Sequence, residues 1–171
     1  METWDAIRAR RNVRQFEDRP IPPEALDQIL EAARRTPSSR NWQPWDFVVV
    51  TDRERLQQLA KTWMGGGHVA RSAATIAVVA PVPKDDFERT WTPYDLGQAT
   101  MNIMLASTDL GIGTGHSAVG DQELAREILG LPEDRYLAYM IALGYPADRP
   151  LKPINNPSRR PFDEVVHREH W

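Results

Sequence analysis

Arginine is the residue type in this sequence that is best suited to hold a charged ligand. The 171-residue chain has 18 Arg and only 3 Lys, and Arg10, Arg11 and Arg14 form one cluster while Arg159 and Arg160 form another. Guanidinium groups bind phosphate in a bidentate manner, and a bound anion relieves the repulsion within a cluster. On charge alone, each cluster is better explained as a solvated surface or helix end. Together they favour one bound phosphate over an extended nucleic-acid surface.

A second group of side chains suited to ligand binding lies just before the first apolar run. Residues 38–45 include two Ser, an Asn, a Gln and two Trp. Ser and Asn are ordinary loop residues, yet this concentration of polar and indole groups exceeds what a turn needs. Hydroxyl and amide groups could hydrogen-bond to the edge of a planar heterocycle, while Trp42 or Trp45 covers apolar surface.

Motifs for side-chain catalysis and for metal binding are absent. The chain has no Cys, no Gly-x-Ser-x-Gly elbow and no Walker loop, which excludes thiolate chemistry and the usual hydrolase and NTPase sites. His167 and His170 are three positions apart without a surrounding metal motif, so we expect neither a metal site nor a catalytic side chain. The glycines at 111, 113 and 115 do not fit the dinucleotide fingerprint. A cofactor that carries its own chemistry is therefore favoured.

Length and composition indicate one domain, spanning 1–171, without a membrane segment. A net charge of −3 excludes a broad nucleic-acid binder. The start of the chain lacks the pattern of a signal peptide. The longest apolar run, 73–82, is shorter than the ~20 residues that span a bilayer. We therefore expect a cytoplasmic protein.

The elements that must position the candidate residues alternate between helix and strand. Helical periodicity and capping residues predict helices that begin at Thr3, run from Pro23 to about Thr36, begin after Asp52, and span 94–110 and 121–129. Apolar runs predict strands at 47–50, 74–80 and 136–144, with a glycine-rich strand or turn at 111–116. This order of elements favours a single α+β or α/β sandwich.

Three further expectations concern the surface. Residues 84–93 are expected to form a polar excursion, and Arg53, Arg55 and Arg126 are expected on solvated helix faces. Five prolines between 146 and 161 exclude helix and central strand. Because apolar side chains follow these prolines, residues 146–171 are expected to form an extended arm that docks on a surface.

Six segments in order carry a recognisable pattern. They are 6–16 (AIRARRNVRQF), 32–45 (AARRTPSSRNWQPW), 95–99 (DLGQA), 109–114 (DLGIGT), 141–146 (IALGYP) and 159–166 (RRPFDEVV). Together they resemble the FMN-dependent nitroreductase family over nearly the whole chain, and 32–45 is the most specific segment. The chain departs from the family at Asn12, where Ser is usual, and at 84–93, where longer relatives carry helices that cover the substrate.

The resemblance implies a fold, an assembly and a cofactor site. The fold is α+β, a nitroreductase-like three-layer sandwich with a central mixed sheet, and two chains form a homodimer with exchanged C-terminal arms and two FMN sites at the interface. The phosphate and ribityl chain are implied to contact Arg10, Arg11, Asn12, Arg14 and either Arg159 or Arg160. The isoalloxazine ring is implied to contact Pro37, Ser38, Ser39 and Asn41 of the other subunit. Flavin N5 is implied to lie near Ala118, Val119 and Gly120, with the N–H of Gly120 closest.

The implied activity is that of an FMN-dependent NAD(P)H oxidoreductase. NADH or NADPH would deliver hydride to flavin N5 by a ping-pong scheme, and a nitroaromatic, quinone or similar acceptor would then take the electrons. No acidic or basic side chain is needed, and no nucleic-acid or membrane partner is expected. The same fold could instead serve reductive dehalogenation, a deazaflavin-linked reaction or flavin breakdown. A flavin-binding protein without turnover is the non-enzymatic alternative.

Overall fold

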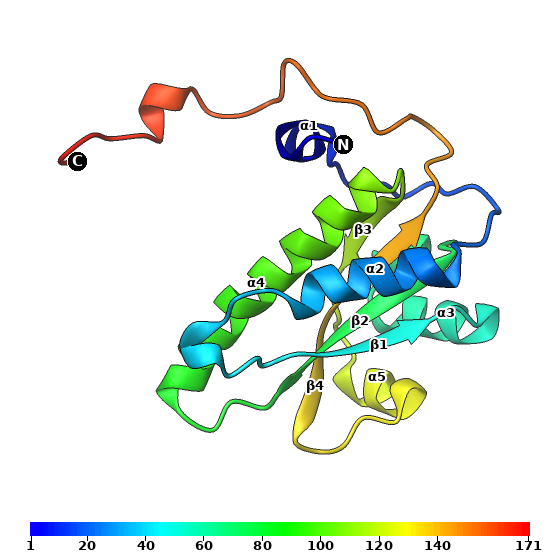
Figure 1. Ribbon diagram of the computed structural model, residues 1–171. Coiled ribbons are helices and arrows are strands. Elements are labelled where there is room, and N and C mark those ends of the chain that lie inside the picture. The colour runs from blue at the N-terminus through cyan, green and yellow to red at the C-terminus, as the bar shows by residue number, and fades with distance from the viewer.

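The computed structural model describes residues 1–171 and places one sheet between two layers of helices (Figure 1). The helices are α1 (Thr3–Ala9), α2 (Pro23–Arg34), α3 (Arg53–Leu59), α4 (Asp86–Asp109) and α5 (Gln122–Leu129). The strands are β1 (Asp46–Val50), β2 (Ala74–Pro81), β3 (Gly113–Ser117) and β4 (Arg135–Gly144). Short 3₁₀ turns occur at Ser39–Asn41, Ala60–Thr62, Gly66–His68 and Phe162–Glu164.

Each face of the sheet carries its own apolar core, because strand side chains alternate between the faces. On one face Ile76, Val78 and Ile141 pack against residues of α2 and α4. On the other face Ala77 and Met140 pack against residues of α3 and α5. The three-layer α+β sandwich predicted from the sequence is confirmed.

The strands follow the order β1-β2-β4-β3, and every neighbouring pair is antiparallel. The prediction of a mixed sheet is therefore wrong, because all three strand pairs are antiparallel. The parallel contact is an isolated bridge between Asn12 and Thr114, and it does not extend into a ladder because Asn12 lies in an irregular segment. This bridge nevertheless holds the segment 10–14 against the edge strand β3.

Residues 84–93 do not form a polar excursion, because α4 already begins at Asp86. The side chain of Asp85 accepts a hydrogen bond from the N–H of Glu88 at 2.8 Å. The Glu88 carboxylate in turn accepts from the N–H of Lys84 at 2.8 Å. These reciprocal bonds satisfy N–H groups at the helix start, as in a capping box. The helix then continues through Pro93, although proline removes one backbone hydrogen bond there.

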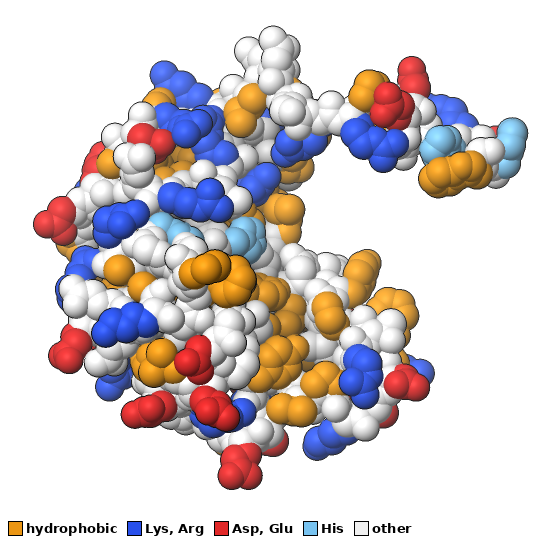
Figure 2. Space-filling model, turned by 180° about the vertical axis from the view of Figure 1, so that it is seen from behind, with side chains coloured by type: hydrophobic (Ala, Val, Ile, Leu, Met, Phe, Trp, Pro, Cys, Tyr) orange, Lys and Arg blue, Asp and Glu red, His pale blue; other side chains and the backbone are white.

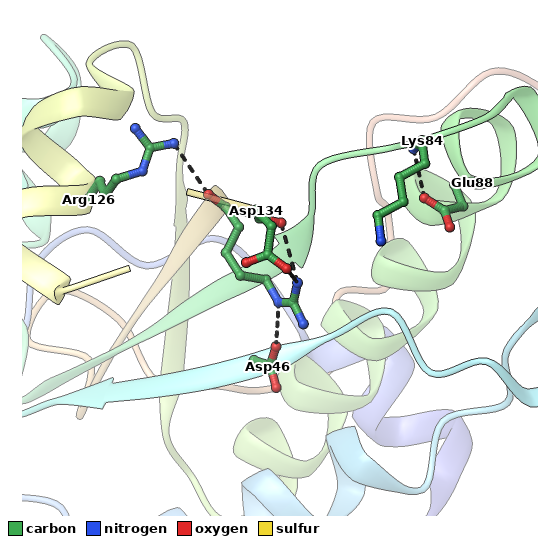
Figure 3. Close-up of polar contacts among 6 residues, drawn as sticks. Asp46, Lys84, Glu88, Arg126 and Asp134 are labelled. Carbon is green, nitrogen blue, oxygen red and sulfur yellow. Dashed lines mark hydrogen bonds and ion pairs between the residues drawn. The ribbon is translucent and has the colours of Figure 1, made fainter. Parts of the chain in front are cut away.

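Figure 3 shows the polar contacts around the start of β4. Nε of Arg135 lies 3.3 Å from a carboxylate oxygen of Asp46 on β1, and its Nη1 lies 2.7 Å from Asp134. Arg126 of α5 donates from Nη2 to the carbonyl of Arg135 at 3.4 Å. These contacts join α5, β4 and β1 at one end of the sheet.

The expectation of a solvated helix face is wrong for Arg126 but is confirmed for Arg53, which is exposed. Arg53 donates from Nη1 to the carbonyls of Ala70 and Ser72 at 2.9 and 3.0 Å, and so fastens the turn that precedes β2. Arg126 is half-buried against β4. Arg55 is exposed, as expected.

The C-terminal segment runs over α1 and then leaves the rest of the chain (Figure 1). Its first part is fastened by a hydrogen bond from the N–H of Ile154 to the carbonyl of Arg8 at 3.1 Å. Further along, Phe162 is 65% exposed and Trp171 is 98% exposed. Such large apolar side chains are usually covered in a folded protein. None of the helices combines the length and apolar character needed to cross a bilayer.

Candidate functional site

The arginine-rich segment 10–14 is anchored between the end of α1 and β3. Val13 is buried, and its N–H donates to the carbonyl of Thr114 at 2.8 Å. The neighbouring side chain of Asn12 turns toward β3, where its Oδ1 lies 3.3 Å from Nδ1 of His116. The buried valine thus fixes the backbone from which the flanking arginines extend.

The three arginines of this segment differ in their partners. Arg11 donates from Nη2 to the carbonyl of Lys152 at 2.6 Å and so ties α1 to the C-terminal arm. The guanidinium groups of Arg10 and Arg14 make no hydrogen bond and no ion pair within the chain, and Arg14 is exposed. Two unpaired guanidinium groups held by a rigid backbone are suited to bind a phosphate.

One arginine of the second cluster meets the first cluster in space. Arg159 and Arg10 line the same cavity of about 460 Å³, between α1, α4 and the arm, together with Met101 and Leu105. Arg160 instead donates to the carbonyl of Glu164 at 2.9 Å within the arm. The structure therefore brings Arg159, and not Arg160, to the first cluster.

Two histidines lie beside the arginines. Burial, together with the nearby Arg14 guanidinium, lowers the pKa of His68 below its ordinary value. Burial likewise lowers the pKa of His116, with further contributions from Arg10 and His68. On the face seen in Figure 2, pale-blue histidine side chains lie among blue Lys and Arg side chains, next to a hollow with apolar walls. The side chains around these histidines are basic and could receive an anionic, partly apolar ligand.

The absence of a side chain at Gly115 of β3 permits this close arrangement. A Cβ at this position would lie 2.3 Å from the carbonyl oxygen of Val13 and 3.0 Å from Cδ2 of His68. Segment 10–14 and the turn at Gly66–His68 can therefore both approach β3 only because residue 115 is glycine.

Replacing Gly115 with Ala is expected to lower the free energy of unfolding by about 1–3 kcal/mol, because the new methyl group overlaps a backbone oxygen that has no free space to move. Thermal denaturation followed by circular dichroism measures this loss. Gly97→Ala is the matched control, because nothing lies within 4 Å of the corresponding Cβ on α4. Equal midpoints for wild type and Gly115→Ala would contradict the assigned packing.

Residues 38–45, whose side chains are expected to contact the edge of a planar heterocycle, form a tight loop with unfavourable backbone angles. Arg40, Asn41 and Gln43 have φ values of 54°, 56° and 52°. These angles lie in the left-handed region, where non-glycine residues are disfavoured by about 1–2 kcal/mol each. Ser38 stabilises the loop from within, since its Oγ accepts from the N–H of Gln43 at 3.0 Å.

A buried carboxylate of α4 holds this loop in place. Asp95 is fully buried, and its two oxygens accept from the N–H of Ser39 at 3.1 and 3.0 Å. The same carboxylate accepts from Oγ of Ser39 at 3.2 Å and from Nε1 of Trp42 at 3.0 Å. Asp95 therefore replaces water for several donors at once and fixes the loop on α4.

Aromatic side chains continue from this loop along the start of α4. The ring of Trp42 lies 6.1 Å from that of Phe87, and Phe87 lies 6.4 Å from Trp91. The guanidinium of Arg40 lies 4.4 Å above the Phe87 ring. Trp45, by contrast, is buried in the core between the sheet and helices α2 and α4. The ring that can cover a ligand is therefore that of Trp42.

The segment 118–120 follows β3 and was expected to offer a backbone N–H. The N–H of Gly120 donates to the carbonyl of Thr62 at 2.8 Å, and the ring of Trp63 lies within 3.1 Å of a Cβ at this position. The N–H groups of Ala118 and Val119 have no acceptor within the chain. The free donors of this segment are therefore the two residues before Gly120.

The predicted site residues fall into two groups in one chain. Arg10, Arg14 and Arg159 lie around α1 and the arm, whereas the loop with Ser39 and Asn41 lies at the other end of α4 (Figure 1). Pro37 and Ser38 belong to the second group. The groups do not meet around one cavity of this chain.

Sequence reasoning missed three residues of the site. No motif in the sequence singles out His68 or His116, and Asp95 stands there only as part of the segment 95–99. The glycines before His68 and around His116 were a usable signal, because glycine permits close approach of backbone segments. For Asp95 the signal was an Asp within an otherwise apolar helical run.

Comparisons with known proteins identify the family of the chain. The model of the Nitroreductase family matches residues 7–81 and 58–145. A protein of Archaeoglobus fulgidus with the provisional name NADH dehydrogenase/NAD(P)H nitroreductase is 36% identical, over 99% of this chain and 99% of its own. An FMN reductase [NAD(P)H] of Bacillus subtilis is 30% identical, over 99% of this chain and 74% of its own.

Solved structures give the same result for the fold. An FMN-dependent nitroreductase of Clostridium difficile superimposes with a TM-score of 0.85 at 26% identity, covering 97% of this chain and 98% of its own. The agreement extends over both helical layers and the sheet between them. The chain therefore belongs to the nitroreductase family.

Proposed function

We propose that the protein is an FMN-dependent NAD(P)H oxidoreductase that passes electrons to a small planar acceptor such as a nitroaromatic or a quinone. The observation that carries the proposal is the pair of unpaired guanidinium groups of Arg10 and Arg14 beside β3 in a chain of this family. The names of relatives, FMN reductase and FMN-dependent nitroreductase, support the same chemistry. Such an enzyme would work in the cytoplasm, where NADH and NADPH are supplied.

The residues present fit FMN at its anionic end. Arg10 and Arg14 lack partners, Arg159 lines the cavity next to Arg10, and Nε2 of His68 is buried without a hydrogen-bond partner. A buried polar atom without a partner usually indicates a missing ligand or water. A phosphate with a hydroxylated chain would supply the acceptors that these groups need.

The chain's own residues would bind and orient the cofactor. Arg10, Arg14 and Arg159 would hold the phosphate, with Asn12 and the backbone of Arg11 near the ribityl chain. The free N–H groups of Ala118 and Val119 are better placed than that of Gly120 to donate to the ring. When bound, FMN supplies hydride acceptance from NADH or NADPH and electron transfer to the acceptor. Binding and orientation then leave no acid–base role for a side chain.

A homodimer would complete the site. The loop residues Pro37, Ser38, Ser39 and Asn41 would reach the ring of FMN held by the partner subunit. Exposed apolar side chains on α1, α4 and the arm support such an interface, namely Trp4, Ile7, Met101, Phe162 and Trp171. In this assembly the C-terminal arm would wrap the second copy.

Anaerobic spectroscopy tests the proposal. Purified protein is expected to be yellow, or to become so with added FMN, and to bind about one FMN per chain. Addition of NADH or NADPH without oxygen should bleach the visible band, because the proposed activity requires hydride transfer to the flavin. A colourless protein that cannot be reconstituted contradicts the proposal, and a bound flavin that neither nucleotide bleaches favours a flavin-binding protein without turnover.

A further inference from the structure

His68 is held deep in the structure by a packed turn. Its side chain is 3% exposed, and Gly66 before it packs so tightly that a Cβ there would lie 2.4 Å from the carbonyl oxygen of Ala60. Nε2 of His68 is buried and has no hydrogen-bond partner. Leaving such an atom unsatisfied is unfavourable by about 1–3 kcal/mol, so the imidazole has capacity for a further contact or a proton.

His116 lies on β3 directly against the arginine-rich segment. Its Nδ1 is 3.3 Å from Oδ1 of Asn12, and its ring lines a cavity of about 310 Å³ with Thr100 and Tyr139. Burial, mainly, raises the pKa of Tyr139 to about 12, so this phenol stays neutral across the range in which histidine titrates. His116 therefore connects the arginine segment with the wall of α4.

The charged groups that act on the two imidazoles are all basic. Arg14 acts on His68, and Arg10 acts on His116, which His68 also influences. No carboxylate oxygen lies within 4.0 Å of either ring. Without an anion, burial and repulsion by the arginines keep both imidazoles neutral near pH 7.

A bound phosphate changes the sign of this local field. The two negative charges of a phosphate bound to Arg10 and Arg14 would cancel the repulsion that these side chains exert on the histidines. From this arrangement, and on the basis of the proposed FMN binding, we propose that His68 and His116 form a proton site beside the arginine segment 10–14, which takes up a proton when the phosphate of FMN binds. His68 also acts on the titration of His116, so the uptake is assigned to the two histidines together.

The direction of the pH dependence follows from this linkage. The pair binds a proton more tightly with FMN present, so FMN binds more tightly as the pH falls from the bound-state pKa toward the free-state pKa. Below both pKa values the gain in FMN affinity no longer changes with pH. If FMN binding raises the pKa of the pair by one unit, the affinity for FMN below both pKa values is about tenfold higher than above them. Protonation of the phosphate itself, with a pKa of about 6, weakens FMN binding as the pH falls. This contribution is the same in wild type and variants.

Calorimetric titration of flavin-free protein with FMN tests the proposal. Titrations at pH 6.5 in phosphate-free buffers of different ionisation enthalpy give the net number of protons taken up. We expect wild type to take up about 0.3–0.5 proton more than His116→Gln or His68→Gln. His170→Gln, in the exposed arm, should match wild type. Riboflavin, which lacks the phosphate, should give no difference between wild type and the histidine variants.

The outcomes separate this inference from the proposed function. Equal proton uptake by wild type and both histidine variants, with FMN bound, overturns the proton site and leaves FMN binding intact. Failure of wild type to bind FMN overturns the proposed function itself. Because His68 is buried and its variant could misfold, the partly exposed His116 provides an independent variant on which the proposal can fail.

Discussion

Replacing Arg14 with Ala is expected to weaken FMN binding about 10- to 100-fold, because a charge-assisted hydrogen bond to phosphate contributes about 1.5–3 kcal/mol. The exposed guanidinium makes no hydrogen bond and no ion pair within the chain, so its removal should leave the free energy of unfolding nearly unchanged. Quenching of flavin fluorescence on titration of flavin-free protein measures the dissociation constant. Riboflavin should bind wild type and variant equally well, since it offers no phosphate.

Arg55→Ala is the matched control for this prediction, because Arg55 is exposed on α3 and its side chain has no partner. Arg53 is unsuitable as a control, since it fastens the turn before β2 through two carbonyls. Arg159→Ala should weaken FMN binding as well, and the double variant with Arg14→Ala should depart from additivity because both side chains would contact one phosphate. Retention of FMN affinity in Arg14→Ala would rule out segment 10–14 as the phosphate site.

The parts of the fold that the sequence predicts are those set by local patterns. Asp52 was expected to cap a helix, and its carboxylate accepts from the N–H of Arg55 at 2.9 Å. The helix over 121–129 was expected to end at Leu129, and the next residue, Gly130, has a φ of 64°. Both features depend on a few consecutive residues and on the backbone geometry of helix ends.

The start of α4 shows where a local rule failed. Residues 84–93 were expected to form a polar excursion, whereas the capping pair of Asp85 and Glu88 stabilises a helix that begins at Asp86. The spacing of Asp85 and Glu88 fits a capping pair and indicates this earlier start. Proline removes one hydrogen bond, which capping and aromatic contacts along the same helix offset.

The polar contacts of the site could not be derived from local patterns, because they join distant segments. Asp95 meets Ser39 across 56 positions, and Asn12 meets His116 across 104 positions. The family resemblance indicated which segments matter, but neither the burial of His68 nor the choice of Arg159 over Arg160 follows from it. Both depend on how the turn at Gly66–His68 and the arm pack in three dimensions.

Replacing Asp95 with Ala is expected to release the loop that carries Ser39 and Asn41. The carboxylate is fully buried and satisfies the N–H and Oγ of Ser39 and the indole N–H of Trp42. Without it these donors lose their acceptor, and each buried unsatisfied donor is unfavourable by about 1–3 kcal/mol. We expect the free energy of unfolding to fall by about 2–4 kcal/mol in total, as measured by urea denaturation.

Hydrogen exchange separates the local effect from a general loss of stability. Peptides over 37–45 should lose protection in Asp95→Ala under conditions where β2 and β4 remain protected, because the strained angles at Arg40 and Asn41 persist only while Asp95 holds them. Asp95→Asn should recover part of the protection, since one carbonyl oxygen still accepts. Asp86→Ala, which removes an exposed carboxylate from the same helix, should leave the loop unchanged. Wild-type protection of 37–45 in Asp95→Ala would show that the loop holds its conformation without this carboxylate.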